Sequence, residues 1–122
     1  MRVVFDSNIL IDHLRNVAAA TEELYRYDRE SKSISLITWI EVMAGATAEN
    51  EDVTRGLLDE FVVLSITEDI AERSAMIRRG RRMKLPDAII WATAQISGRM
   101  LVTRNTRDYP SDNIGVRIPY QI

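Results

Sequence analysis

Residues 2–14 read RVVFDSNILIDHL, an apolar run that is broken by three polar residues and then resumes. Val3-Val4-Phe5 is β-branched and aromatic, which predicts a short buried strand. The polar residues 6–8 include good helix N-cap types, and the apolar residues that follow recur at helical spacing up to Asn16. The stretch therefore predicts a buried strand that runs directly into a helix, with an acid, Asp6, at the junction.

The same alternation continues along the chain. Further strands are expected at residues 33–37, 61–64, 100–103 and 115–118. Helical patterns cover residues 22–30, 38–45, 49–60, 67–77 and 86–94, with Gly98 after the last. Short apolar strands that alternate with helices are typical of a parallel sheet covered on both faces. We expect a three-layer α/β/α domain with a mostly parallel sheet of four or five strands.

Composition bounds the size and the chemistry. At 122 residues and 46% apolar content, the chain is expected to form a single domain over residues 1–122. It has no cysteine and one histidine, which excludes disulfide scaffolds, iron–sulfur clusters and thiol nucleophiles. No apolar run approaches the roughly 18 residues that a membrane span needs, and no signal peptide is evident. We therefore expect a cytoplasmic protein.

The net charge of −2 hides a gradient along the sequence. Residues 1–72 carry 6 basic and 15 acidic side chains, whereas residues 73–122 carry 10 basic and 3 acidic side chains. The densest basic stretch is Arg78, Arg79, Arg81, Arg82 and Lys84. It has two interpretations: an arginine-rich helix end that suits the helix dipole, or a surface for a polyanion such as nucleic acid.

Acids follow the predicted strands. Asp6 follows the first strand and Glu41 the second; Asp108 follows the fourth, and Asp87 begins the apolar helix before it. In open parallel sheets ligands bind at the carboxyl ends of the strands, so these acids can converge. Gathered carboxylates repel one another unless a cation or protons neutralise them, and Mg²⁺ prefers oxygen ligands. The pattern predicts a metal site suited to phosphodiester hydrolysis.

Each acid also has a purely structural interpretation. Asp6 could cap a helix, and Glu41 could complete a capping box with Thr38. Asp87 could complement a helix dipole, and Asp108 could be an ordinary loop residue. It is the joint position after strand ends that favours a site.

Four stretches in order resemble PIN-domain ribonucleases, especially the VapC toxins of bacterial toxin–antitoxin pairs. They are the opening residues 3–12 (VVFDSNILID), residues 35–45 (SLITWIEVMAG), residues 85–94 (LPDAIIWATA) and residues 101–109 (LVTRNTRDY). The third is similar to the family's acid before an alanine-rich helix. The fourth resembles the closing Thr-x-Asn-x-x-Asp-Phe pattern, with Tyr109 in place of phenylalanine. The resemblance implies a PIN-like domain over almost the whole chain.

The resemblance also implies roles for particular residues. Asp6 and Asp87 match the principal Mg²⁺ or Mn²⁺ ligands, and Glu41 matches a third acid that binds metal directly or through water. Some relatives carry an acid at the position of Asn105, so either Asn105 or Asp108 completes the site. Ser7, Asn8 and Thr103 are expected to support the acids by hydrogen bonds. Residues expected to contact RNA phosphates are Arg78, Arg79, Arg81, Arg82, Arg104 and Arg107.

On this resemblance the protein is expected to be a Mg²⁺-dependent endoribonuclease, the toxin of a type II toxin–antitoxin pair. A VapB-like antitoxin and a second copy of the chain are the expected protein partners, with RNA as substrate and no membrane. Two alternatives remain. One is a PIN-like module that binds RNA or a partner without cleaving, and Asn105 keeps it open. The other is a phosphoacceptor receiver domain, which expects paired acids after the first strand and a lysine after the last.

Overall fold

The computed structural model describes residues 1–109, 113 and 115–121. The five strands are β1 (Val3–Phe5), β2 (Lys32–Ser35), β3 (Val62–Leu64), β4 (Met100–Val102) and β5 (Val116–Arg117). The helices are α1 (Ser7–Leu14), α2 (Ala18–Leu24), α3 (Leu36–Ala44), α4 (Glu51–Leu58), α5 (Glu68–Gly80) and α6 (Leu85–Ser97), with a short 3₁₀ helix at Arg29–Ser31. The elements follow one another in the predicted order.

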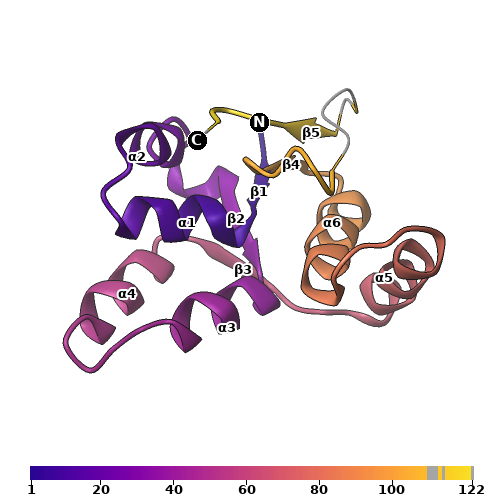
Figure 1. Ribbon diagram of the computed structural model, residues 1–122, viewed down its shortest axis with the longest axis horizontal. Helices are drawn as coiled ribbons and strands as arrows, with labels where there is room; N and C mark the ends of the chain where they lie inside the picture. The colour runs from indigo at the N-terminus through magenta and orange to yellow at the C-terminus, as the bar shows by residue number, and fades with distance from the viewer. Residues whose placement is uncertain (110–112, 114, 122) are drawn as a thin grey trace.

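The strands form one sheet in the order β3-β2-β1-β4-β5, and every neighbouring pair is parallel. Figure 1 shows α1 to α4 on one side of this sheet and α5 and α6 on the other. The α/β/α prediction with a parallel sheet is confirmed, and the predicted fifth strand exists at the edge. A receiver domain would have the strand order 2-1-3-4-5, so the topology contradicts that alternative.

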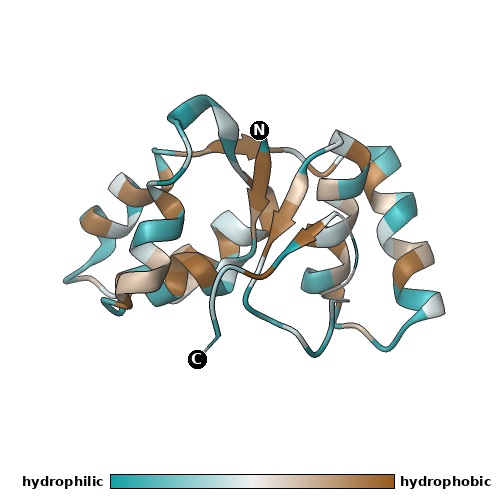
Figure 2. Ribbon diagram, turned by 90° about the horizontal axis from the view of Figure 1, so that it is seen from above, coloured by the Kyte–Doolittle hydropathy of each residue, from teal (hydrophilic) through white to brown (hydrophobic). Residues whose placement is uncertain are grey.

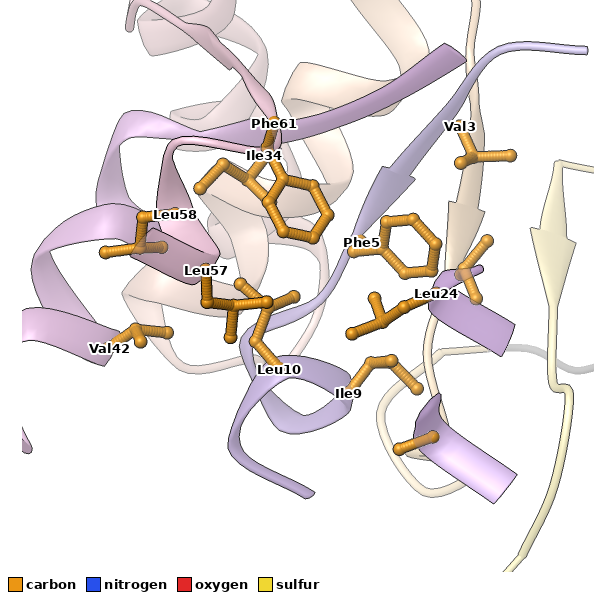
Figure 3. Packing of buried hydrophobic residues seen from close by; sticks show 12 residues of the cluster. Val3, Phe5, Ile9, Leu10, Leu24, Ile34, Val42, Leu57, Leu58 and Phe61 are labelled. Carbon is orange, nitrogen blue, oxygen red and sulfur yellow. The ribbon is translucent and has the colours of Figure 1, made fainter. Parts of the chain in front are cut away.

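Strand β1 is buried on both faces because its side chains alternate between two cores. Phe5 points into the core under α1, α2, α3 and α4, together with Phe61 (Figure 3). Its ring meets those of Tyr27 and Phe61 edge to face, each at a centroid distance of 5.8 Å. Val4 points the other way, toward Trp91 and the α5–α6 layer. Figure 2 shows the apolar strands in the middle, surrounded by helices and loops in which hydrophilic and hydrophobic residues alternate.

Local signals place the boundaries of the elements. Asn16 adopts a left-handed backbone with φ of 65°, which ends the first helical segment where predicted. The Thr67 hydroxyl accepts a hydrogen bond from the amide of Ile70 and caps α5. Gly98, with φ of 67°, ends α6 in the left-handed conformation that glycine tolerates best.

Two predicted boundaries were wrong. Strand β2 ends at Ser35, whose side chain accepts a hydrogen bond from the amide of Ile37, and α3 begins at Leu36, two residues earlier than expected. Glu41 therefore lies inside α3 and not in a capping box with Thr38. The helix expected over 22–30 was also wrong, because α2 ends at Leu24 and Tyr27 reaches the core from a turn.

Candidate active site

A pocket of about 280 Å³ lies at the carboxyl edge of the sheet. We call it the acid pocket, and its lining includes seven of the predicted site residues: Asp6, Ser7, Asn8, Glu41, Asp87, Asn105 and Asp108. Ile11, Lys84 and Pro86 complete the lining. The sheet topology explains the convergence, since the chain leaves β1, β2 and β4 on the same edge.

Asp6 is the most deeply placed of these acids, with 4% of its surface exposed. Its Oδ2 accepts a hydrogen bond from the Thr103 hydroxyl at 2.8 Å and another from the Asn8 amide at 3.3 Å. Although Asp6 occupies the N-cap position of α1, its carboxylate caps no amide in the described chain. Asp6 is therefore the N-cap residue of α1 by its backbone position, while its carboxylate lines the pocket.

Burial raises the pKa of Asp6 to about 7. The hydrogen bond from Thr103 opposes this rise, whereas the neighbouring charges of Asp87 and Glu41 add to it. The Thr103 hydroxyl is itself oriented, because it accepts the backbone amide of Asn105 at 3.0 Å. A carboxylate in this position is costly to ionise unless a cation or a proton accompanies it.

Glu41 projects from α3 toward the start of α1. Its Oε1 accepts a 2.6 Å hydrogen bond from the Ser7 hydroxyl, and Ser7 Oγ also lies 3.3 Å from Thr38 Oγ1. Ser7 follows Asp6 directly, so this contact couples the acid after β1 to the acid after β2. Ser7 thus supports Glu41, while Asn8 and Thr103 support Asp6.

Asp87 lies in the first turn of α6, just after Pro86. Burial raises the pKa of Asp87, and the charges of Asp108 and Glu41 raise it further, whereas Lys84 opposes them. The Tyr109 hydroxyl donates to the Asp87 backbone carbonyl at 3.1 Å, and its ring packs edge to face on Trp91. Tyr109, which stands in place of the phenylalanine of the Thr-x-Asn-x-x-Asp-Phe pattern, thus tethers the loop after β4 to the start of α6.

In the loop after β4, a hydrogen bond from Asn105 holds the side chain of Asp108 in place. The Asn105 amide donates to Asp108 Oδ2 at 2.9 Å, and Asn105 Oδ1 accepts the backbone amides of Arg107 and Asp108 at 3.0 and 3.2 Å. Asn105 therefore acts as a brace, and the negative charge at this end of the pocket belongs to Asp108.

The candidate metal-ligand atoms in the lining of the acid pocket are oxygens of carboxylates, hydroxyls and amides, which suit a hard divalent cation. Within the described residues, no three acidic or histidine side chains are close enough to hold one ion together. Mg²⁺ typically takes only one or two carboxylates, with water and substrate phosphate in its other positions, so the donor set fits this ion.

The predicted RNA-contacting arginines fall into two groups. Arg78, Arg81 and Arg82 line a second hollow with Met83 and Lys84, which we call the basic hollow. The other three lie outside its lining: Arg79, Arg104 and Arg107. Arg104 is paired with Asp12, at 3.2 Å between Nη2 and Oδ1, so its guanidinium is already engaged.

Two residues beyond the predicted site residues shape this site. Asp12 is buried and accepts hydrogen bonds from Arg104 and, at 2.8 Å, from the Tyr120 hydroxyl, which fixes the chain next to Thr103. Nothing in the sequence pairs these distant residues. Lys84 lines the acid pocket, and its position just before the Leu-Pro-Asp stretch was a usable signal.

None of the helices in the described ranges is long and apolar enough to cross a membrane.

Three comparisons relate the chain to known proteins. Ribonuclease VapC10 of Mycobacterium tuberculosis is 38% identical over 115 residues, which cover 88% of this chain and 86% of that protein. The tRNA(fMet)-specific endonuclease VapC of Shigella flexneri is 27% identical over 119 residues, 89% and 90% of the two chains. A chain of a toxin–antitoxin complex from Klebsiella pneumoniae superposes with a TM-score of 0.90 at 45% identity and covers 98% and 99% of the two chains.

The PIN domain family model matches residues 3–110, which include the acids after β1, within α3, at the start of α6 and after β4. This match agrees with the order of the sheet and with the convergence of those acids on one edge. The chain therefore belongs to the PIN domain family.

Proposed function

We propose that this protein is a Mg²⁺-dependent endoribonuclease that acts as the toxin of a type II toxin–antitoxin pair. The observation that supports this function most directly is the buried carboxylate of Asp6, which lies near Asp87 and Glu41. A cation there would offset the energetic cost of burying its charge. The similarity to a protein named ribonuclease VapC10 supports RNA as the substrate.

Asp6 and Asp87 would hold the divalent ion, for which Mn²⁺ is expected to substitute, with Glu41 acting on it through water. Asp108, braced by Asn105, would supply the fourth negative charge. When bound, such an ion supplies an activated water and stabilises charge on the phosphate and the leaving oxygen. The residues of the chain would hold the RNA in line with these carboxylates and keep the carboxylates oriented.

The basic hollow beside the acid pocket supports binding of a polyanion, and its arginines are proposed to contact RNA phosphates. We also propose a VapB-like antitoxin as partner, because a chain of a toxin–antitoxin complex is 45% identical to this one. The exposed apolar residues Leu36 and Ile40 of α3 and Val62 and Val63 of β3 support a homodimer. The protein is proposed to act in the cytoplasm as a single domain over residues 1–122.

Two experiments test this function. Purified, antitoxin-free protein is incubated with a panel of RNAs in Mg²⁺ or Mn²⁺, beside an Asp6→Ala, Asp87→Ala double variant and an exposed-acid control, Glu22→Gln. We expect cleavage by the wild type and the control and none by the double variant. RNA binding without cleavage by folded wild-type protein would instead favour the non-cleaving module.

The second experiment is in cells. The chain is expressed with and without the neighbouring upstream gene, and cellular RNA is mapped at its 5′ ends. Growth arrest that this gene relieves, together with a discrete new 5′ end, is the expected result. Full arrest by the double variant would contradict a metal-dependent nuclease.

A further inference from the structure

Lys84 stands where two surface hollows of opposite charge meet. The acid pocket contains four carboxylates, and the basic hollow of about 390 Å³ lies next to it. Lys84 is the residue common to both linings. No other cationic side chain lines the acid pocket in the part of the chain that the structure describes.

The backbone around Lys84 is fixed on both sides. Lys84 is the N-cap residue of α6, and its carbonyl accepts the amide of Ala88 at 3.0 Å. The preceding Met83 is buried, and its carbonyl accepts a 2.6 Å hydrogen bond from the Arg78 guanidinium at the end of α5. The side chain of Lys84 is exposed, so an anchored backbone carries a solvent-accessible cation in the lining of the pocket.

The neighbouring arginines extend the positive charge away from the acids. Arg81 lies over the Trp91 ring at 5.1 Å, and Arg82 is exposed beside it. On its other flank the acid pocket shares Ile11 and Glu41 with a hollow whose lining has one cation, the exposed Arg15, among otherwise apolar or neutral residues. The basic hollow therefore presents four cations to phosphates on one flank of the acids, whereas the lining on the other flank presents Arg15 alone.

An RNA strand is a polyanion, so the acid pocket itself repels it wherever no cation intervenes. A strand that leaves the pocket over Lys84 meets the cations of the basic hollow within a short distance. A strand that leaves across Glu41 meets that carboxylate and a single cation, Arg15. Coulombic cost therefore separates the two directions.

From this asymmetry we propose that Lys84 binds the phosphate next to the scissile one and leads the RNA into the basic hollow, so that the enzyme grips its substrate on one side of the cleavage point. Lys84 would be a positioning residue that acts through the substrate backbone. The inference rests on the proposed ribonuclease function.

Salt dependence of RNA binding tests the contact without cleavage. A fluorescein-labelled 12-nucleotide single-stranded RNA is titrated by anisotropy in EDTA at several salt concentrations. Each phosphate contact to a single strand contributes about 0.7 to the slope of log K against log salt. We expect Lys84→Gln to reduce the slope by about 0.7 and Lys84→Arg to preserve it.

Arg26→Gln is the matched control, since it removes one exposed positive charge beside Met100, at the start of β4 and the opposite end of the sheet. Its slope is expected to equal that of the wild type. An equal loss in Arg26→Gln, or an unchanged slope in Lys84→Gln, overturns the inference while the ribonuclease proposal stands. A wild-type protein that binds no RNA overturns both.

Substrate length tests the direction. Once cleavage is mapped, two RNAs are compared that extend four nucleotides beyond a minimal substrate on the 5′ or the 3′ side only. One extension is expected to lower KM about fivefold, the scale of an exposed charge pair. Lys84→Gln should reduce that gain with kcat little changed, because the strand then lacks the cation that leads it into the basic hollow. Equal gains from both extensions, or a loss in kcat alone, would overturn one-sided binding.

Discussion

The substitution Asp6→Asn is expected to stabilise the metal-free protein while it abolishes cleavage. The buried carboxyl of Asp6 has a pKa of about 7, against an ordinary value of 3.8. The folded protein thus keeps this proton up to about pH 7, whereas the unfolded chain loses it near pH 4. Burial of Asp6 therefore does not lower the free energy of unfolding below pH 3.8. The destabilisation grows between pH 3.8 and about pH 7 and is complete above pH 7.

The difference between the two pKa values corresponds to about 4 kcal/mol at pH 8 and to about 1.7 kcal/mol at pH 5. Asparagine is isosteric and neutral, and its Oδ1 can accept the hydrogen bonds that Thr103 and Asn8 now donate to Asp6. The variant should therefore gain up to these amounts in free energy of unfolding.

Urea unfolding followed by circular dichroism in EDTA at pH 5 and pH 8 measures the effect, with Glu22→Gln as the exposed control. A stability gain that is larger at pH 8 than at pH 5 is expected for Asp6→Asn alone. Added Mg²⁺ should narrow the gap at pH 8, because it stabilises the wild type. A variant less stable than the wild type at pH 8, or a gain that is the same at both pH values, would refute the assignment of a strained carboxylate.

Two further predictions concern the surroundings of the site, and a third concerns the C-terminal end of α6. Arg104→Ala should lower the free energy of unfolding by about 3 kcal/mol, because it leaves the buried Asp12 carboxylate without its cation, and urea unfolding measures this. Asn105→Ala removes the brace of Asp108 and should reduce kcat about tenfold or more in an RNA cleavage assay while the melting temperature changes little; an unchanged kcat would show that the brace is dispensable. Gly98→Ala should cost about 1 kcal/mol, since alanine is strained at φ of 67°, and thermal unfolding would expose the error if the variant were as stable as the wild type.

Local sequence signals were sufficient for most of the fold. The run Val3-Val4-Phe5 followed by Asp6 predicted a buried strand and an acid at its end, and both are present. The prediction failed where apolar spacing had two explanations. Tyr27 fits a helical period, but it is an aromatic residue that packs on Phe5 from a turn. Periodicity alone cannot distinguish a buried residue in a helix from a buried residue in a turn.

The sequence by itself determined the chemical type of the site. Without cysteine and with a single histidine, the chain offers carboxylate, amide and hydroxyl oxygens as metal ligands after its strands. The order of the acids along the chain matches the PIN pattern. Local propensity and residue chemistry are properties of short segments, so they can be read before the chain folds.

Tertiary structure alone decided which charges are already neutralised and which remain for a ligand. Arg104 is identical in kind to Arg82 in the sequence, yet the fold pairs Arg104 with the buried Asp12 and leaves Arg82 exposed in the basic hollow. Lys84 gained its position between the two hollows in the same way. Electrostatic interactions depend on distance and burial in space, and residues 92 positions apart, as Asp12 and Arg104 are, acquire both only when the sheet forms.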